Sequence, residues 1–169
     1  LAFADVDGDG DEDVLINGGS QNNQLFSHLY INDGGGNFTL DPNTPFEALF
    51  GGGVAFADVD GDGDEDVLIT GANENLQPVS NLYVNNGSGN FTLDPATPFE
   101  GVWFSSVAFS DVDGDGDEDV LITGQNAILQ FFSNLYINDG GGNFTLDPTT
   151  PFEEGGGGAL AFADVDGDG

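Results

Sequence analysis

The sequence of 169 residues has no lysine, arginine, cysteine or methionine, and one histidine. Without lysine or arginine it offers no permanently cationic side chain to phosphate groups, so neither nucleic acid nor an anionic membrane surface is expected as a partner. Without cysteine, no disulfide bond can stabilise the fold. No apolar run approaches the roughly 20 residues of a membrane-spanning helix, so membrane insertion is not expected.

Acidic residues, by contrast, are abundant and clustered. There are 31 Asp and Glu, the formal net charge is −31, and about two thirds of these residues lie in copies of one string, D-V-D-G-D-G-D-E-D, at 5–13, 58–66, 111–119 and, shortened, 164–169. Like charges about 4 Å apart repel by about 1 kcal/mol per pair even in water. Strings this dense are therefore expected to bind a cation.

The copies begin at residues 5, 58, 111 and 164, so the chain is a tandem repeat with a period of 53 residues. This period predicts one supersecondary unit repeated about three times. We divide the chain into repeat 1 (1–53), repeat 2 (54–106), repeat 3 (107–159) and the start of a fourth repeat (160–169). A fourth repeat that stops within an acidic string suggests a stretch of a longer array.

Each repeat is expected to form four short strands and no helix. In the first, apolar runs at 2–4 and 14–16 flank the acidic string, and aromatic and β-branched runs at 29–32 and 38–40 flank a glycine-rich turn. Pro42 and Pro45 then predict an extended linker, because proline cannot donate a hydrogen bond to a central strand. We predict an all-β chain with about 38% hydrophobic residues to form its core.

The acidic string has the ligand chemistry of a calcium loop. Asp5, Asp7 and Asp9 are spaced two residues apart, Gly10 allows the backbone to turn, and oxygen ligands at this density favour calcium. A helix-loop-helix calcium site would need Glu at position twelve, where this chain has Ile16. We expect Asp13 to close the site instead, together with the main-chain carbonyl of Asp11.

The string D-x-D-x-D-G-x-x-D between short apolar strands, followed by L-Y-V-N-N-G-S-G-N-F at 82–91, resembles the FG-GAP and VCBS-type repeats of integrin α-subunit propellers and bacterial surface proteins. The resemblance covers nearly every residue and implies four-stranded propeller blades that bind Ca²⁺. The ligands it implies are Asp5, Asp7, Asp9, Asp11, Asp13, Asp58, Asp60, Asp62, Asp64, Asp66, Asp111, Asp113, Asp115, Asp117 and Asp119, with Asp164, Asp166 and Asp168 beginning a fourth site.

Three complete repeats are fewer than the four to eight blades of a typical closed propeller. The array is therefore expected to be either an open superhelical fibre or part of a closed β-propeller. Because each repeat mainly contacts its neighbours, we expect its partners to be neighbouring repeats or copies of itself.

Other residues were weighed for function. N-x-T sequons at Asn37, Asn90 and Asn143 match the glycosylation pattern, although a hairpin would favour the same residues. His28 occupies the place of Asn81 and Asn134 in the other repeats, so a catalytic role is not expected. With no Lys, Arg or Cys, an activated nucleophile cannot be assembled, and we expect no enzymatic activity.

Two classes of function follow. The first is a calcium-stabilised, extracellular or cell-surface structural or adhesive repeat protein, part of a fibre, because sites of extracellular affinity bind calcium at about 10⁻⁴ to 10⁻³ M. The alternative is a ligand-binding propeller of the integrin or lectin kind. In that case the variable stretches 17–27, 71–80 and 124–133 would contact glycans or extracellular proteins.

Overall fold

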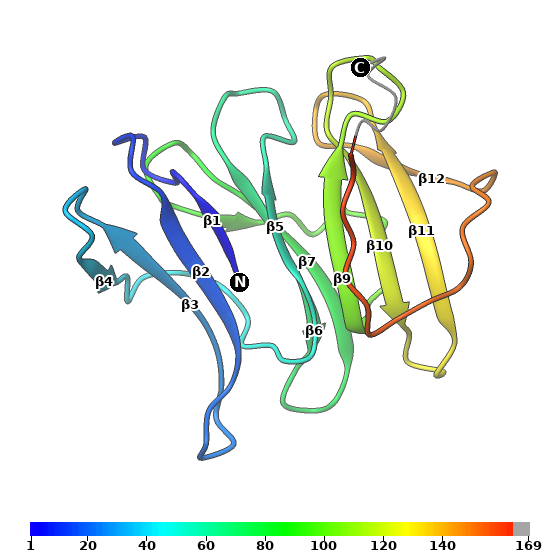
Figure 1. Ribbon diagram of the computed structural model, residues 1–169, viewed down its shortest axis with the longest axis horizontal. Coiled ribbons are helices and arrows are strands. Elements are labelled where there is room, and N and C mark those ends of the chain that lie inside the picture. The colour runs from blue at the N-terminus through cyan, green and yellow to red at the C-terminus, as the bar shows by residue number, and fades with distance from the viewer. Residues whose placement is uncertain (164–169) are drawn as a thin grey trace.

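The structure is a computed structural model that describes residues 1–163 as β-strands and connecting loops, with no helix in that range (Figure 1). The predicted all-β class is confirmed. No helix in the described residues could therefore span a membrane. The strands are β1 (Ala2–Ala4), β2 (Asp13–Gly19), β3 (Leu25–Asn32), β4 (Phe38–Leu40), β5 (Val54–Ala57), β6 (Asp66–Ala72), β7 (Pro78–Val84), β8 (Thr92–Leu93), β9 (Trp103–Ser110), β10 (Asp119–Gln125), β11 (Phe131–Asn138) and β12 (Phe144–Asp147).

These strands form three antiparallel four-stranded sheets, which we call blade 1 (β1–β4), blade 2 (β5–β8) and blade 3 (β9–β12). In each blade every strand pairs with the next in sequence, as predicted for one repeat. Strand β9 starts at Trp103, four residues before the predicted start of repeat 3, and Gln125 pairs with Trp103 beyond a register shift. Within residues 1–163 the three sheets do not close into a ring.

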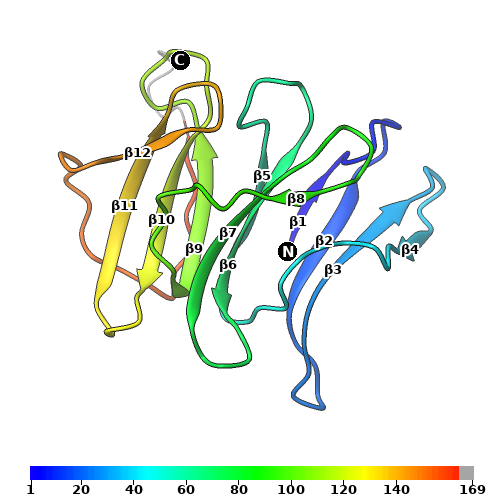
Figure 2. The same ribbon diagram turned by 180° about the vertical axis from the view of Figure 1, so that it is seen from behind.

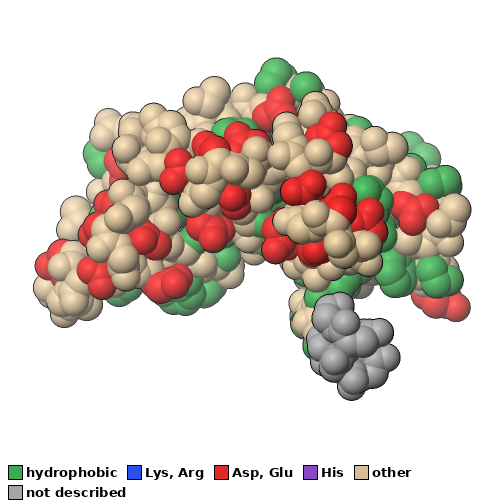
Figure 3. Space-filling view, turned by 90° about the horizontal axis from the view of Figure 1, so that it is seen from above, with side chains coloured by type: hydrophobic (Ala, Val, Ile, Leu, Met, Phe, Trp, Pro, Cys, Tyr) green, Lys and Arg blue, Asp and Glu red, His purple; other side chains and the backbone are tan. Residues whose placement is uncertain are grey.

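The blades stand side by side, as the views from both sides show (Figures 1 and 2). Strands β1, β5 and β9 are neighbours along one side of the array, and β6 also packs against β9. The linkers after β4 and β8 are extended, as their prolines predicted, and each connects the outermost strand of one blade to the first strand of the next. Seen from above, the molecule has an arched outline (Figure 3).

The hydrophobic core lies between blades. One cluster joins Leu15 and Leu29 of blade 1 to Val67 and Tyr83 of blade 2 through Leu49 of the linker. A second cluster joins blades 2 and 3 in the same way, with Val102 in the linker position. A four-stranded sheet has two faces and cannot cover both alone, so each blade is stabilised by its neighbour.

The two edges of the array differ in chemistry. The acidic loops β1–β2, β5–β6 and β9–β10 lie together at the top of Figure 1, and the turns β2–β3, β6–β7 and β10–β11 lie at the bottom. The view from above shows acidic side chains gathered over the upper edge (Figure 3). The tandem repeat therefore places three acidic loops on one edge and three variable turns on the other.

Candidate metal centres

The first aspartate of each acidic loop shapes the turn. Asp5 Oδ1 accepts hydrogen bonds from the backbone N–H groups of Gly8 (2.9 Å) and Asp9 (3.1 Å), and its Oδ2 accepts one from Gly10 (2.9 Å). Gly10 has φ of +92°, a left-handed conformation that glycine adopts without strain. Equivalent bonds occur at Asp58 and Asp111. Each loop is thus held as a closed turn by its own amide groups.

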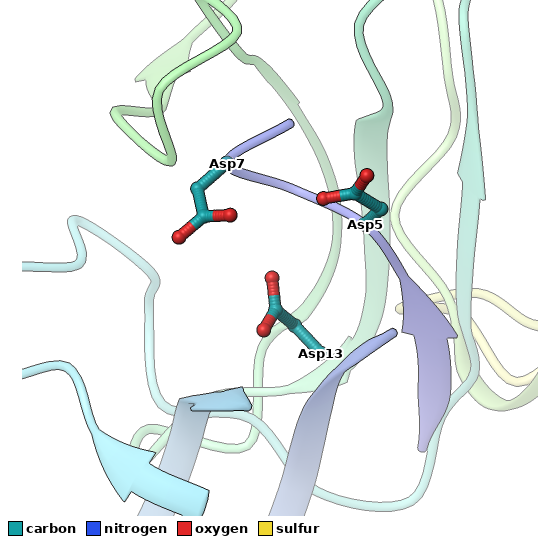
Figure 4. A group of neighbouring side chains, drawn as sticks. All are labelled: Asp5, Asp7 and Asp13. Atoms are coloured by element: carbon teal, nitrogen blue, oxygen red, sulfur yellow. The ribbon is translucent and has the colours of Figure 1, made fainter. Parts of the chain in front are cut away.

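Three carboxylates converge inside each turn. In the first loop, oxygen atoms of Asp5, Asp7 and Asp13 all lie within 4.8 Å of one another (Figure 4). The groups in the other two loops are Asp58, Asp60 and Asp62, and Asp111, Asp113 and Asp115, so there the fifth residue of the loop takes the place of the ninth. Calcium binds six to eight oxygens at about 2.3–2.6 Å, so oxygens on either side of one ion are about 5 Å apart. Each loop can therefore hold one hard cation.

The last aspartate of each loop is buried and anchors it. Asp13 Oδ2 accepts a hydrogen bond from Val6 N–H (3.1 Å), and its Oδ1 accepts one from Asn32 N–H (2.8 Å). Asp66 and Asp119 have the same pair of donors from their own repeats. This carboxylate therefore joins the start of the loop to the end of the third strand.

Burial shifts the pKa of the last aspartate of the loop. It raises the pKa of Asp66 to about 7, with the charges of Asp60 and Asp62 adding to the effect and the two backbone hydrogen bonds opposing it. Burial likewise raises the pKa of Asp13. A cation in the loop would reverse this tendency, because it favours the ionised carboxylate.

The remaining predicted ligands are placed differently. Asp9 lies outside the closest group of its loop, and its Oδ1 accepts a hydrogen bond from Asp11 N–H (3.0 Å). The carboxylates at the seventh position lie against the glycine that opens the glycine-rich turn after the third strand; the pairs are Asp11 with Gly34, Asp64 with Gly87 and Asp117 with Gly140. Main-chain ligation at that position stays a prediction. Asp164, Asp166 and Asp168 lie outside the described residues.

The predicted glycosylation residues Asn37, Asn90 and Asn143 are exposed at these same glycine-rich turns. Asn37 Nδ2 donates to Asp33 (3.0 Å), and Asn143 Nδ2 donates to Asp139 (3.0 Å). These bonds lower the pKa of Asp33 and of Asp139. An attached sugar would compete with this side-chain contact, so glycosylation stays a prediction.

An asparagine that the sequence did not single out connects adjacent blades. Asn85 Nδ2 donates to the carbonyl oxygen of Val6 in the first acidic loop (2.8 Å). Asn138 Nδ2 donates to the carbonyl of Val59 in the second loop, also at 2.8 Å. Its recurrence every 53 residues was the available signal. Because these bonds reach the loop of the preceding blade, they link each candidate metal centre to its neighbour.

A second missed feature is an aromatic contact between blades. Phe46, in the linker after blade 1, packs on Tyr83 and Phe91 of blade 2, with ring centroids 5.0 Å apart in both pairs. At the next interface Phe99 packs on Tyr136 and Phe144 with the same centroid distances. Phe91 and Phe144 are 7% exposed, whereas Phe38, at the equivalent position of blade 1, is 46% exposed.

The lower edge carries a polar groove of about 540 Å³ between blades 1 and 2. Its lining includes Asn23 and Gln24 from one turn, Glu47 from the linker, and Asn73 and Glu74 from the next turn. The amides of Asn73 and Asn81 donate to the two oxygens of Glu47 at 3.1 and 3.0 Å. The groove therefore presents amide and carboxylate groups of fixed orientation.

Comparisons with known proteins agree with this architecture. A search of curated protein sequences gives no match. Among solved structures, a fucose lectin from Kordia zhangzhouensis in complex with methyl-fucoside superimposes with a TM-score of 0.54 and 14% sequence identity over 86% of this chain and 96% of that chain. At this identity the likeness concerns the fold alone.

The family comparison covers nearly the whole chain. A model described as "FG-GAP-like repeat" matches three times, at residues 5–69, 58–122 and 111–169. Each match begins at the first aspartate of an acidic loop; the first two run past the next loop, and the third ends within the shortened fourth string. Together with three blades of identical topology, these matches show that the chain belongs to the FG-GAP-like repeat family.

Proposed function

We propose that this chain is a calcium-stabilised extracellular repeat module with a structural or adhesive role and no catalytic activity. The observation that carries the proposal is the convergence of three carboxylate oxygens within 4.8 Å in each of three loops that their own amide groups hold closed. No lysine or arginine is present to neutralise these carboxylates. A divalent cation is the natural counter-charge.

The stabilisation expected from bound calcium supports an extracellular location. Sites with a dissociation constant of about 10⁻⁴ to 10⁻³ M, in about 2 mM calcium, stabilise the fold by about 0.6 to 1.8 kcal/mol each. Three loops would add about 2 to 5 kcal/mol, a large part of a typical total of about 5 to 15 kcal/mol. Cytosolic calcium is too low to fill such sites.

Calcium titration with thermal unfolding tests this. We expect calcium to raise the melting temperature, excess chelator to lower it, and magnesium to replace calcium poorly because it requires tighter octahedral geometry. Asp60→Asn should remove about one of three binding events seen by calorimetry. Glu74→Gln is the matched control, since it removes one exposed charge from the opposite edge. An unchanged melting temperature in calcium and in chelator would refute the proposal.

A second candidate function is sugar binding at the lower edge. Two observations favour it: the polar groove beside Asn23, Glu47 and Asn73, and the fold shared with a lectin bound to methyl-fucoside. Amides and carboxylates can donate to and accept from sugar hydroxyls. Leu76 and Leu129 occupy the position of Asn23 in the next two turns. Their backbones are left-handed and their side chains are exposed, so they would add apolar contacts.

Calorimetry with methyl-fucoside and a panel of other monosaccharides tests this second function. Binding that Gln24→Ala weakens and that Asp60→Asn leaves unchanged would place the sugar in the groove. No binding to the panel at millimolar concentration would reject the candidate.

A further inference from the structure

Two buried asparagines connect the acidic loops of adjacent blades. We propose that Asn85 and Asn138 are positioning residues that couple calcium binding at neighbouring centres, so that an ion in one loop strengthens binding in the next. The inference rests on the proposed calcium-binding function and extends it, because it names the residues through which separate loops act together. Both asparagines lie at interfaces inside the array, between blades 1 and 2 and between blades 2 and 3, and each is 3% exposed.

The side chain of Asn85 holds one peptide group of the first acidic loop. The carbonyl oxygen of Val6 accepts hydrogen bonds from Asn85 Nδ2 (2.8 Å) and from Gly89 N–H (2.9 Å). This peptide group joins Val6 to Asp7, which is one of the three converging carboxylates (Figure 4). Within residues 1–163 both donors to this carbonyl belong to blade 2. The orientation of this part of the loop therefore depends on the next blade.

The main chain of the same asparagine contacts the second loop. Asn85 N–H donates to Asp66 Oδ1 (2.8 Å), and Asp66 Oδ2 accepts a hydrogen bond from Val59 N–H (3.1 Å). Asn85 Nδ2 also donates to Glu65 O (3.3 Å), which helps to fix its amide group. One residue therefore contacts a predicted ligand of the second centre through its backbone and the first loop through its side chain.

Asn138 makes the same contacts one blade further along the array. Its N–H donates to Asp119 Oδ1 (2.8 Å), and its Nδ2 donates to the carbonyl oxygen of Val59 (2.8 Å). Val59 is also the residue whose N–H donates to Asp66. The hydrogen bonds therefore form one continuous path from the third loop to the first, through Asp119, Asn138, Val59, Asp66, Asn85, Val6 and Asp13.

Close packing surrounds this path. Val6 is 1% exposed and belongs to the core cluster between blades 1 and 2. A Cβ atom placed on Gly89 would lie 3.8 Å from the Cβ of Asp7. The equivalent distance from Gly142 to Asp60 is 3.7 Å. The glycine-rich turn of one blade thus lies directly against a carboxylate residue of the preceding loop, so the two cannot move independently.

Ordering of the loops gives the coupling its sign. A cation orders the carboxylates that bind it, and the hydrogen bonds of Asn85 or Asn138 extend that order to the adjacent loop. Binding a second ion then costs less conformational entropy, which makes binding cooperative. Repulsion between the two ions opposes this effect, but salt at about 0.15 M screens it with a Debye length of about 8 Å. Coupling of binding free energies is reciprocal, so either ion strengthens the binding of the other.

Calcium titration of the whole chain, followed by ¹⁵N NMR in about 0.15 M salt, tests the proposal. The amides of Gly10, Gly63 and Gly116 report one centre each, because each donates to the first aspartate of its own loop. Asp60→Asn, which weakens the second centre, should lower the calcium affinity read at Gly10 by about fivefold or more. With Asn85→Ala already present, Asp60→Asn should leave the affinity at Gly10 nearly unchanged.

Two further variants are controls. Asn138→Ala should leave the coupling of the first and second centres intact and remove the effect of Asp60→Asn that is read at Gly116. Asn90→Ala removes an exposed asparagine from the same turn as Asn85, whose amide donates only within that turn, and should leave both couplings intact. Circular dichroism verifies folding, and Asn138→Ala is the independent test if Asn85→Ala does not fold.

The outcomes separate this proposal from the calcium proposal. A less stable Asn85→Ala chain with an undiminished effect of Asp60→Asn at Gly10 would show that the asparagine is only structural. Affinity at Gly10 that Asp60→Asn leaves unchanged or increases would also overturn the coupling. In both cases the calcium response of the unaltered chain would leave the calcium proposal standing. If no glycine amide responded to calcium at about 10 mM, well above the weakest expected dissociation constant, both proposals would be wrong.

Discussion

Blades 1 and 2 have nearly the same sequence but different surroundings. The second strand of blade 2, β6, is buried along its whole length, whereas β2 of blade 1 is buried only over its first three residues. Phe91 is 7% exposed and its equivalent Phe38 is 46% exposed. Within residues 1–163, blade 2 has a neighbour on each side and blade 1 has one. The burial of a residue in this chain therefore depends on the number of neighbouring blades as well as on its position in the repeat.

The largest expected difference in stability is between two phenylalanines at equivalent positions, Phe91 and Phe38. Phe91→Ala should lower the free energy of unfolding by about 3 to 5 kcal/mol, because it removes a buried ring between blades. Phe38→Ala should cost below about 1 kcal/mol in the monomer, since that ring is half exposed. Urea denaturation of both variants at low concentration measures the difference. Equal losses would contradict the view that burial comes from the neighbouring blade.

A smaller difference is expected at the valines of the acidic loops. Val59→Ala should cost about 1.5 to 2.5 kcal/mol, because two buried methyl groups are lost between blades 2 and 3. Val112→Ala should cost less than about 0.5 kcal/mol, as is usual for an exposed position. Thermal unfolding in calcium gives both values. If Val112→Ala proved the more costly, the exposed loop of blade 3 would need another partner.

Removal of the side-chain hydroxyl should destabilise the fold at Tyr83 more than at Tyr30. The Tyr83 hydroxyl accepts a hydrogen bond from Glu47 N–H (2.9 Å) across the interface. Tyr83→Phe leaves that N–H without its acceptor and should cost about 1 kcal/mol or slightly more. Tyr30→Phe should be nearly neutral, because the Tyr30 hydroxyl has no such hydrogen bond within residues 1–163. Urea denaturation of both variants tests both statements.

The last expected effect is a pH dependence of the calcium-free chain. Burial raises the pKa of Asp66 to about 7, so the folded state holds a proton that the unfolded state, with an ordinary pKa of about 3.9, has lost. The free energy of unfolding should therefore fall as the pH rises from about 4 to about 7. The raised pKa values of Asp13, Asp60, Glu65 and Glu118 act in the same direction.

Urea denaturation in chelator between pH 5 and pH 8 measures this slope, with Asp66→Asn as the variant that should flatten it. Because calcium binds the ionised carboxylate, calcium affinity should rise over the same pH range. Stability that increased with pH in chelator would show that the buried aspartate is ionised in the folded, metal-free chain.

Much of the fold could be predicted because local signals repeat. The apolar runs beside the acidic loop and the glycine-rich turn fixed the four strands of each repeat and their order. The wider site could not be predicted in the same way. Asn32, Asn85 and Asn138 look identical in sequence, but two of them donate to the preceding blade and one does not. Asn85 and Asn138 donate to the carbonyls of Val6 and Val59, which lie 79 residues earlier in the sequence.

The sequence by itself therefore determined the repeat, the all-β class and the spacing of carboxylates in each loop, because these depend on backbone propensity and on residues close together in the chain. Only the tertiary structure decided which copy of each residue is buried and which carboxylates converge. The physical reason is that a side chain on the face of one blade is buried only when a neighbouring blade packs against it. Identical repeats acquire different environments when one has a neighbour and another does not.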